Sequence, residues 1–384
     1  MDQPLRIGFA SIEDAASVSS WSGIPATVLG MLRETPNVEV ELISPLGQRF
    51  KWIYGLPRLR ADLAKEQFDW KRESGSLQHF ALQIERAFRD RKLDVIFSTS
   101  SIPGTRLRRE VPVVFWTDAN VHAMQGYYRK DVSARSGRAC LLQEEEALGS
   151  ARFACYASDW AAAEARKLID PERVKVLPFG PNLPITHTSD NVEGWIEERC
   201  RHLSKRCSLL FVGVEWERKG GAIAVETARR LRDAGISANL RVVGCTPPEP
   251  MPDFVELHGF IDKREPQGQQ QMMQLYQSSD IFVLPSRAEA FGVVVAEAAA
   301  FGLPALVTHT GGLSETVQEG RTGFRLPLED DGMLFAQRAA AVVWDYRRFA
   351  RNAYLEFEQR LNWRTSVDAL VQLLRKAAGR DGAA

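Results

Sequence analysis

The chain has 384 residues, which is too many for one ordinary domain and enough for two domains with their own hydrophobic cores. Its 49 basic and 49 acidic residues balance, whereas proteins that bind duplex nucleic acid normally carry an excess of Lys and Arg, so we expect no nucleic-acid partner. No apolar stretch reaches the roughly 18 residues that a membrane-spanning helix needs, so we expect no membrane span.

The first predicted strand is the apolar run Leu5–Ala10. A loop containing Gly23 and a helix from Pro25 to about Arg33 follow, and then a strand at Val38–Ile43. This order favours a parallel sheet with right-handed crossovers, in which ligands bind beyond the carboxyl ends of the strands. Gly23 lies at such an end, where either a ligand approaches the backbone closely or the glycine serves an ordinary turn.

The segment Arg49–Arg72 mixes basic and aromatic residues with some acidic ones. One interpretation is a surface that meets an anionic membrane or a lipid-linked acceptor. The other is a solvated helix whose aromatic side chains pack inward, and the interspersed acidic residues favour it. The basic and aromatic residues are Arg49, Lys51, Trp52, Tyr54, Arg58, Arg60, Lys65, Trp70, Lys71 and Arg72.

Two further buried strands are predicted at Asp94–Thr99 and Val111–Trp116. Asp118 follows the second of these strands at its carboxyl edge, where it could accept a hydrogen bond from a substrate hydroxyl, and His122 nearby could titrate. Either residue could instead cap the next helix. The proline- and glycine-rich loop of residues 178–184 marks a boundary, so we expect an N-terminal domain at 1–184 and an interdomain linker at 185–207.

A second αβ domain is expected at residues 208–360, followed by a C-terminal helix at 361–384 that packs back on the N-terminal domain. The first strand of this second domain is Leu209–Val212, and it leads into Gly213 and the loop GVEWERKGG. Arg218 and Lys219 in this loop suit a diphosphate, although a solvated turn would explain them as well. The loop is not a Walker A motif, and no G-x-G-x-x-G follows either first strand, which argues against NAD.

Another group of candidate site residues lies in the stretch PSRAEAFGVVVAEAAAFG, after the apolar run Ile281–Leu284. Glu289 lies in the loop and Glu297 lies in the helix that begins near Phe291, so two carboxylates and the unpaired N–H groups of a helix start meet. A nucleotide sugar uses both kinds of group, while a buried Ala/Val helix with one polar face is the plain alternative. A glycine pair at Gly311 and Gly312 follows the next strand, before Ser314 and Glu315, which we expect to open a helix.

Taken in order, these residues resemble retaining glycosyltransferases of family 4, which have the GT-B fold of two Rossmann-like parallel-sheet domains facing each other across a cleft. The resemblance covers most of the chain and is strongest from Leu209 to Leu326. The E-x7-E signature of the family matches Glu289 and Glu297, and GGLSETVQEGRTGF resembles the segment that follows it. SSWSGIPATVLGML resembles the loop over the donor phosphates, so Gly23 carries over.

The resemblance implies a role for each matching residue. Glu297 is expected to bind the ribose hydroxyls, and Glu289 is expected to face the transferred sugar. The backbone N–H groups of Ala290, Phe291, Gly292 and Val293 are expected to hold sugar hydroxyls and phosphate, and the main chain at Phe260 and Ile261 is expected to meet the base. Two departures stand out: Gly213-Val214 replaces the usual Gly-Arg, which leaves Arg218 to take that role, and Asp118 replaces a frequent His.

We therefore expect transfer of a hexosyl group from a nucleoside diphosphate sugar to a glycan, lipid-linked or small-molecule acceptor, with retention of configuration. Glu289 and Asp118 are the expected catalytic residues, and neither a cofactor nor a metal ion is expected. A nucleotide-sugar-binding subunit without catalysis is the main alternative, and a GT-B epimerase is a second one. The scattered five cysteines and the N-terminus MDQPLRIGFAS favour a cytoplasmic protein, with peripheral contact to the inner face of the membrane left open.

Overall fold

The computed structural model describes residues 3–18, 20–89, 91–108, 110–128, 131–203 and 205–380. Ser19 of the predicted glycine loop, the side chain of Arg49 and residues 381–384 of the predicted C-terminal helix lie outside this part. The chain divides into two compact units, Met1–Pro178 with Ser366–Ala384, and Phe179–Thr365. Among the described residues, no helix is both long enough and apolar enough to cross a membrane.

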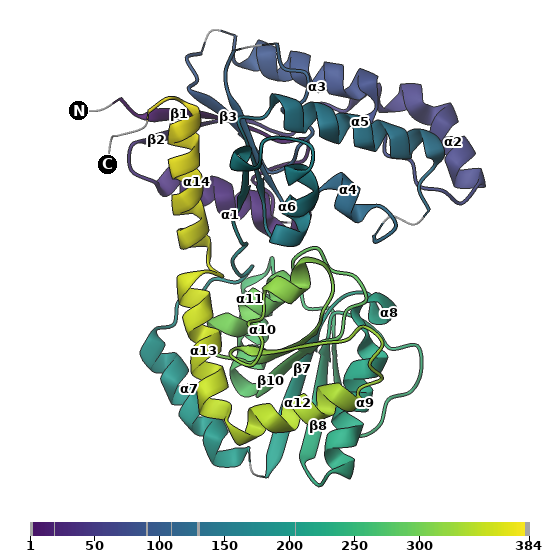
Figure 1. The fold of residues 1–384 in the computed structure, drawn as a ribbon, viewed down its shortest axis with the longest axis vertical. Coiled ribbons are helices and arrows are strands. Elements are labelled where there is room, and N and C mark those ends of the chain that lie inside the picture. The colour runs from purple at the N-terminus through teal and green to yellow at the C-terminus, as the bar shows by residue number, and fades with distance from the viewer. Residues whose placement is uncertain are drawn as a thin grey trace. The chain divides into compact units, whose positions relative to one another are not determined.

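The first unit is built on a six-stranded parallel sheet with the order β2-β1-β3-β4-β5-β6, flanked by helices (Figure 1). Its strands are β1 (Leu5–Ala10), β2 (Val38–Ile43), β3 (Val95–Ser98), β4 (Val113–Thr117), β5 (Phe153–Tyr156) and β6 (Val174–Val176). Its helices are α1 (Ile24–Glu34), α2 (Gly55–Leu63), α3 (Ser74–Ala87), α4 (Val121–Met124), α5 (Ala134–Ser150) and α6 (Asp159–Arg166). Short 3-10 turns are η1 (Ser20–Gly23), η2 (Arg49–Tyr54), η3 (Trp70–Arg72) and η4 (Pro171–Arg173).

The second unit repeats this plan with the strand order β12-β11-β10-β7-β8-β9. Its strands are β7 (Arg206–Val212), β8 (Ser237–Val243), β9 (Val255–Gly259), β10 (Ile281–Leu284), β11 (Ala305–Thr308) and β12 (Gly323–Leu326). Its helices are α7 (Ser189–His202), α8 (Trp216–Lys219), α9 (Gly221–Asp233), α10 (Pro266–Ser278), α11 (Val293–Ala300), α12 (Met333–Trp344) and α13 (Tyr346–Gln359), with the 3-10 turn η5 (Gly311–Glu315). Helix α14 (Trp363–Ala377) begins in this unit and continues in the first.

The strands are short apolar runs because both faces of each sheet are covered. Every residue of β3, β5, β10 and β11 is buried, as expected for parallel sheets with helices on their faces. The core of the second unit joins these strands to the inner faces of its helices, and Phe211, Phe282 and Leu306 in it are completely buried. The apolar runs therefore predicted the strands well.

The stretch predicted as an interdomain linker contains helix α7 and belongs to the second unit. The helix starts with a capping box, in which the side chains of Thr188 and Asn191 each accept a hydrogen bond from the other's backbone N–H. Val192 and Ile196 are buried in the core of the unit. The helix has only a narrow apolar stripe between charged residues, and for this reason its composition resembles that of a linker.

All of α14 after its first three residues lies in the first unit, together with the residues that follow it. Arg380 donates hydrogen bonds to the backbone oxygens of Gln3 and Pro4, at 2.8 and 3.0 Å, and to the Asp94 carboxylate at 2.7 Å. Ser366 Oγ donates to the Pro178 oxygen at 2.5 Å. The C-terminal segment is thus tied to both the start and the end of the N-terminal stretch of this unit.

Two local expectations are wrong. No α-helix opens at Ser314 and Glu315, because Gly311–Glu315 is itself a 3-10 turn from which the chain runs on to β12. In the segment Arg49–Arg72, Tyr54 and Trp70 are buried as expected, but the Trp52 side chain does not pack inward and is 78% exposed. The sequence pattern alone contained no information about which face of this segment the rest of the unit covers.

Candidate functional site

Four of the predicted site residues of the second unit, Gly213, Arg218, Lys219 and Glu289, gather where its strand order reverses. Strands β7 and β10 are neighbours in the sheet, while the chain continues from β7 to β8 on one side and from β10 to β11 on the other. The loops after β7 and β10 therefore leave the same edge and diverge, which is the place where open αβ sheets bind ligands. Gly213 begins one loop, and Pro285 begins the other.

A cluster of two cations and a carboxylate spans these two loops. Lys219 Nζ, on α8, contacts Glu289 Oε2, and Arg218 Nη1 lies 3.7 Å from the same oxygen. The side chains of Lys219 and Glu289 are only 10% and 12% exposed. Arg218 also pairs with Glu215 at 2.7 Å, and this hydrogen bond lowers the pKa of the Glu215 carboxyl. The fold thus joins two motifs that are 70 residues apart in sequence.

Two glycines allow these loops to approach each other. Gly220 has φ +75°, and a Cβ there would overlap the Pro285 carbonyl oxygen, so only glycine fits between α8 and the end of β10. At Gly213, a Cβ would come within 2.7 Å of Lys219 Cγ. Gly213 therefore leaves the space in which the Lys219 side chain crosses the end of β7. The Arg287 N–H also donates to the Arg218 oxygen at 2.7 Å, which fixes the two loops together.

Helix α11 begins directly after this cluster. Gly292 is its N-cap residue in the left-handed region, at φ +87°, and no side chain caps the helix from that position. Ala290 and Phe291 are buried, and the Phe291 ring packs edge-on against Phe179 with ring centroids 5.6 Å apart. The predicted backbone segment from Ala290 to Val293 is therefore a largely buried turn into a helix, and the positive end of the helix dipole lies beside Glu289 in the chain.

Glu297 occupies a different environment, because its side chain is completely buried. Its Oε1 accepts from Lys263 Nζ at 2.7 Å and from the Asn182 N–H at 3.1 Å, and its Oε2 accepts from the Tyr276 hydroxyl at 2.8 Å. Burial, followed by the nearby Glu297 charge, raises the pKa of Tyr276 well above its usual range, so this hydroxyl stays protonated and donates. Both carboxylate oxygens are occupied within the protein.

Sequence reasoning missed the three partners of Glu297. Asn182 lies in the loop that we took for a domain boundary, Tyr276 lies on α10, and Lys263 follows the predicted base-contacting pair by two positions. Of that pair, Phe260 is 70% exposed and Ile261 is packed into the core. A basic residue next to this pair was the one signal that could have pointed to Lys263. The structure therefore adds a cation to the predicted nucleoside-binding region.

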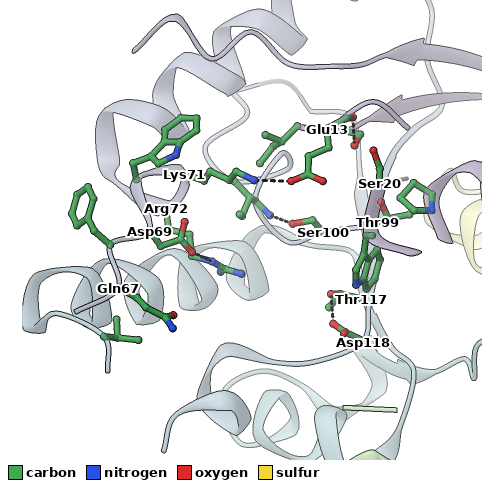
Figure 2. Close-up of a pocket in the computed structure, with 18 residues that line it drawn as sticks. Glu13, Ser20, Gln67, Asp69, Lys71, Arg72, Thr99, Ser100, Thr117 and Asp118 are labelled. Carbon is green, nitrogen blue, oxygen red and sulfur yellow. Dashed lines mark hydrogen bonds and ion pairs between the residues drawn. The ribbon is translucent and has the colours of Figure 1, made fainter. Parts of the chain in front are cut away.

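The first unit has a cavity of about 680 Å³ at the equivalent edge of its sheet (Figure 2). The residues after β1, β3 and β4 contribute to it, including Ser11, Thr99 and Asp118. Lys71 and Glu13 meet across one side at 2.8 Å, as Figure 2 shows. Its lining residues are Ser11, Ile12, Glu13, Ser20, Trp21, Pro25, Gln67, Phe68, Asp69, Trp70, Lys71, Arg72, Thr99, Ser100, Ile102, Thr117, Asp118 and Val132.

Asp118 lies in this cavity wall and does not cap a helix. The side chain of Asn120 accepts from the His122 N–H at 2.8 Å at the start of α4, so Asn120 is the cap. Thr117 Oγ1 donates to Asp118 Oδ1 at 3.4 Å. The expectation that Asp118 or His122 only caps the next helix is therefore wrong for both side chains.

Gly23 ends the loop on the other side of the cavity. Trp21, Ser22 and Gly23 all have positive φ, at 41°, 57° and 80°, and the first two are conformations that residues with a side chain rarely adopt. Gly23 itself is not among the lining residues, but Ser20, Trp21 and Pro25 around it are. Such strain is found at functional segments, where surrounding structure holds it.

The described residues contain no group of three or more His, Cys, Asp or Glu side chains that could hold a metal ion. Arg218, Lys219, Lys263 and the start of α11 are groups of the second unit that could stabilise negative charge.

Comparison with known proteins gives one family match. Residues 206–345 match the family described as "Glycosyl transferases group 1". A D-inositol 3-phosphate glycosyltransferase from Corynebacterium urealyticum is 23% identical over 286 residues, which cover 70% of this chain and 68% of the relative. Further relatives with that description match over 37% to 66% of their own length.

Solved structures match over nearly the whole chain. Sucrose-phosphate synthase from Thermosynechococcus elongatus superimposes with a TM-score of 0.68 and 17% identity, covering 98% of this chain and 99% of that one. Anabaena HepE in complex with UDP-glucose superimposes with a TM-score of 0.59 and 16% identity, covering 98% and 99%. At these identities the likeness concerns the fold.

Proposed function

The chain is a group 1 glycosyltransferase with the GT-B fold, as the sequence predicted, and on this premise we propose that it is a retaining hexosyltransferase that uses a nucleoside diphosphate sugar. We propose that the second unit binds the donor and the first unit binds the acceptor. The acceptor is a glycan, a lipid-linked molecule or a small molecule with a free hydroxyl. The nucleotide sugar is a substrate, and no resident cofactor takes part.

The observation that carries this proposal is the cluster of Arg218, Lys219 and Glu289 at the reversal point of the second sheet. Two cations beside one shielded carboxylate suit a substrate that joins a diphosphate to a sugar. When the diphosphate enters, the cations exchange the carboxylate for phosphate oxygens. Glu289 is then free to face the sugar that the diphosphate carries.

The same cations account for catalysis without a metal ion. As the bond between the sugar and the diphosphate breaks, negative charge grows on the leaving diphosphate, and preorganised cations and helix N–H groups stabilise it. Arg218, Lys219 and the backbone from Ala290 to Val293 supply these groups. Glu289 orients the sugar and supports its positive charge without forming a covalent bond. The incoming hydroxyl attacks the face that the diphosphate leaves, which retains the configuration, and its proton passes to the leaving diphosphate oxygen.

Glu297 is proposed to bind the ribose. Because both of its oxygens are engaged, ribose hydroxyls must replace Lys263, whose side chain is 31% exposed at its position over the buried carboxylate. Lys263 then becomes available to the donor phosphates, and the main chain at Phe260 and Ile261 contacts the base. The complexes of the fold relative HepE with UDP and UDP-glucose make uridine donors the first to test.

The acceptor is proposed to occupy the cavity of the first unit. Its wall combines hydroxyl and carboxylate groups with the Trp21 ring, and sugar rings bind to such mixed polar and aromatic surfaces. Asp118 is placed to accept a hydrogen bond from the acceptor hydroxyl or from the transferred sugar. The Gly23 loop borders the same cavity and is proposed to contact the donor phosphates.

The first experiment is a thermal-shift screen with UDP-, GDP-, ADP- and dTDP-sugars. A matching donor at a hundredfold excess over its dissociation constant stabilises the fold by roughly 2.7 kcal/mol. The stabilising donor is then supplied with candidate acceptors, and NMR of the product reports whether the anomeric configuration is retained. Activity that persists in EDTA supports the metal-independent mechanism.

The decisive variant is Glu289→Gln, which we expect to lower kcat about 100-fold or more while leaving the melting temperature close to wild type. Glu215→Gln is the matched control, because Glu215 also pairs with Arg218 but is 58% exposed. Wild-type turnover in Glu289→Gln contradicts the assignment of Glu289. Donor binding without transfer or hydrolysis in the wild type favours the non-catalytic subunit instead.

A further inference from the structure

Helix α2 and the turn η2 before it present an apolar face to solvent. The exposed fractions are 78% for Trp52, 71% for Leu56, 54% for Leu59 and 78% for Leu63. Ile53 adds a fifth exposed apolar side chain at 40%. Fifteen large hydrophobic residues are exposed among the described residues, and five of them lie within these twelve positions. Scattered exposed apolar residues need no explanation, but such a concentration indicates an interaction surface.

The geometry of α2 explains why these side chains share one face. Leu56, Leu59 and Leu63 are spaced by three and four positions, which places them along one stripe of a helix with 3.6 residues per turn. Ala61, the one buried residue of α2, is two positions from both Leu59 and Leu63 and therefore lies on the opposite side. The helix thus rests on the unit through its small residue and turns its leucines outward, the reverse of an ordinary surface helix.

Basic residues border this apolar stripe. Arg60 lies beside the stripe within α2 and Arg58 lies farther round the helix, while Lys51 and Lys65 lie at the ends of the segment, and all four are exposed. Asp62, on the side of the stripe away from Arg60, is the one carboxylate of residues 51–65 and is 3.8 Å from Arg58, and Glu66 follows the segment. The segment therefore carries an excess of positive charge around an apolar centre.

We propose that the face formed by residues 51–65 docks on an anionic lipid bilayer, with the leucine stripe and Trp52 inserted among the lipid chains. Helices that lie in a membrane interface combine a leucine and aromatic face with flanking Lys and Arg, which attract anionic headgroups. A second copy of the chain is a poorer partner, because a two-fold contact through this stripe would bring together two segments that each carry an excess of positive charge. The charge of the segment thus selects a lipid surface.

Docking at this face selects among the three proposed classes of acceptor, an inference that rests on the proposed function. The cavity wall Gln67–Arg72 begins four residues after Leu63, in the same unit. The residues that would bind the bilayer are therefore only a few positions along the chain from one wall of the proposed acceptor cavity. We infer that the acceptor is a lipid-linked molecule whose hydroxyl-bearing headgroup enters this cavity.

The test is flotation of the full-length protein with vesicles of phosphatidylcholine alone or of equal parts phosphatidylcholine and phosphatidylglycerol. We expect binding to the anionic vesicles that weakens in high salt. Leu56→Ser combined with Leu63→Ser is expected to weaken binding about tenfold or more, and Trp52→Ser is expected to weaken it by a smaller factor. Arg58→Gln with Arg60→Gln should remove the preference for anionic vesicles.

Trp344→Ser is the matched control for Trp52→Ser, since Trp344 is 92% exposed in the second unit and no other described large apolar residue within ten positions of it is exposed. It should float like the wild type. Absence of wild-type binding to anionic vesicles overturns the proposal, as does equal loss in the two tryptophan variants. If size-exclusion chromatography shows a wild-type dimer that Leu56→Ser with Leu63→Ser converts to a monomer, the face is a self-association surface and the proposal is also overturned.

The membrane and transfer proposals can fail separately. The vesicle-binding variants leave Arg218, Lys219 and Glu289 intact, so their thermal shift with the donor sugar should equal that of the wild type. Donor binding without vesicle binding refutes the membrane face alone. Vesicle binding without any donor response refutes the proposed function and leaves the docking surface standing.

Discussion

The two units use the same kind of sheet but place different chemistry at its edge. In the second unit the loops after β7 and β10 bring two cations onto the Glu289 carboxylate in a nearly buried cluster. In the first unit the loops after β1 and β3, which are also neighbours at the reversal point, open into a cavity lined by hydroxyl, carboxylate and aromatic groups. The topology therefore determines where a ligand binds in each unit, and the loop residues determine which kind of ligand it is.

Each unit also contains a buried glutamate with similar hydrogen-bond partners. Glu144 in the first unit and Glu297 in the second are almost completely buried, and each accepts a hydrogen bond from a tyrosine hydroxyl, Tyr156 at 3.3 Å and Tyr276 at 2.8 Å. Glu144 also pairs with Arg72 at 3.2 Å, as Glu297 pairs with Lys263 at 2.7 Å. Similar surroundings thus recur in both units, and we propose a donor contact only for Glu297.

The largest expected effect concerns stability. Arg199 is buried in the second unit and donates to the backbone oxygens of Phe301 and Tyr276, both at 3.0 Å, at the ends of α11 and α10. Arg199→Met leaves these oxygens without donors, and we expect it to lower the free energy of unfolding by about 3 kcal/mol in urea titrations. Hydrogen exchange should then show the loss in α10 and α11.

Arg173 is the counterpart in the first unit. It is partly exposed and donates to the oxygens of Leu148 and Gly149, at 2.9 and 3.0 Å, at the end of α5. Because water can replace a partly exposed donor, Arg173→Met should cost only about 1 kcal/mol. Equal losses in the two variants contradict the view that burial sets the difference.

The next effect concerns the two lysine–carboxylate pairs at the sheet edges. Lys219→Met removes a cation from the proposed diphosphate site, and we expect kcat/KM for the donor to fall about 100-fold. Lys71→Met breaks the Lys71–Glu13 pair in the first unit and should leave donor affinity unchanged. Initial rates at varied donor and acceptor concentrations separate the two cases. Loss of donor affinity in Lys71→Met contradicts the division of roles between the units.

A smaller effect is expected from the buried glutamates. Glu297→Gln removes the negative charge that pairs with Lys263 in the free protein and that is proposed to bind the ribose hydroxyls of the donor. Donor affinity in calorimetry should therefore fall about tenfold. Glu144→Gln makes the same change in the first unit and should leave donor affinity as in the wild type. Both variants should lose stability, so a donor effect that merely follows the melting temperature in both refutes the ribose contact.

The smallest effect is a pH dependence in the second unit. Burial lowers the pKa of His187 below its ordinary value of 6.5, and its ring packs on Trp195 and Phe301. The folded state therefore favours the neutral ring, and this contribution to stability is complete above pH 6.5 and is lost as the pH falls through the lower folded pKa. His187→Gln should flatten the fall of melting temperature over this range. An unchanged profile excludes His187 as its source.

The sequence by itself determined the elements and the central motif. The apolar runs predicted the strands because parallel strands under helices are buried on both faces, as β3 and β10 are. Glu289 could be placed in a loop and Glu297 in a helix, because the apolar strand ends at Pro285 and a stretch rich in Val and Ala begins after Gly292. Both signals are local in the sequence. The predicted resemblance to glycosyltransferases followed from the same local motifs, and the comparisons confirm it.

Only the tertiary structure decided which of these residues meet. Lys219 reaches Glu289 because β7 pairs with β10, a strand that is not next to it in the chain, and Asn182 reaches Glu297 across 115 residues. The narrow apolar stripe of α7 is buried, while the leucine stripe of α2 is exposed. A local pattern states which residues share a face, but burial depends on what the rest of the fold places against that face.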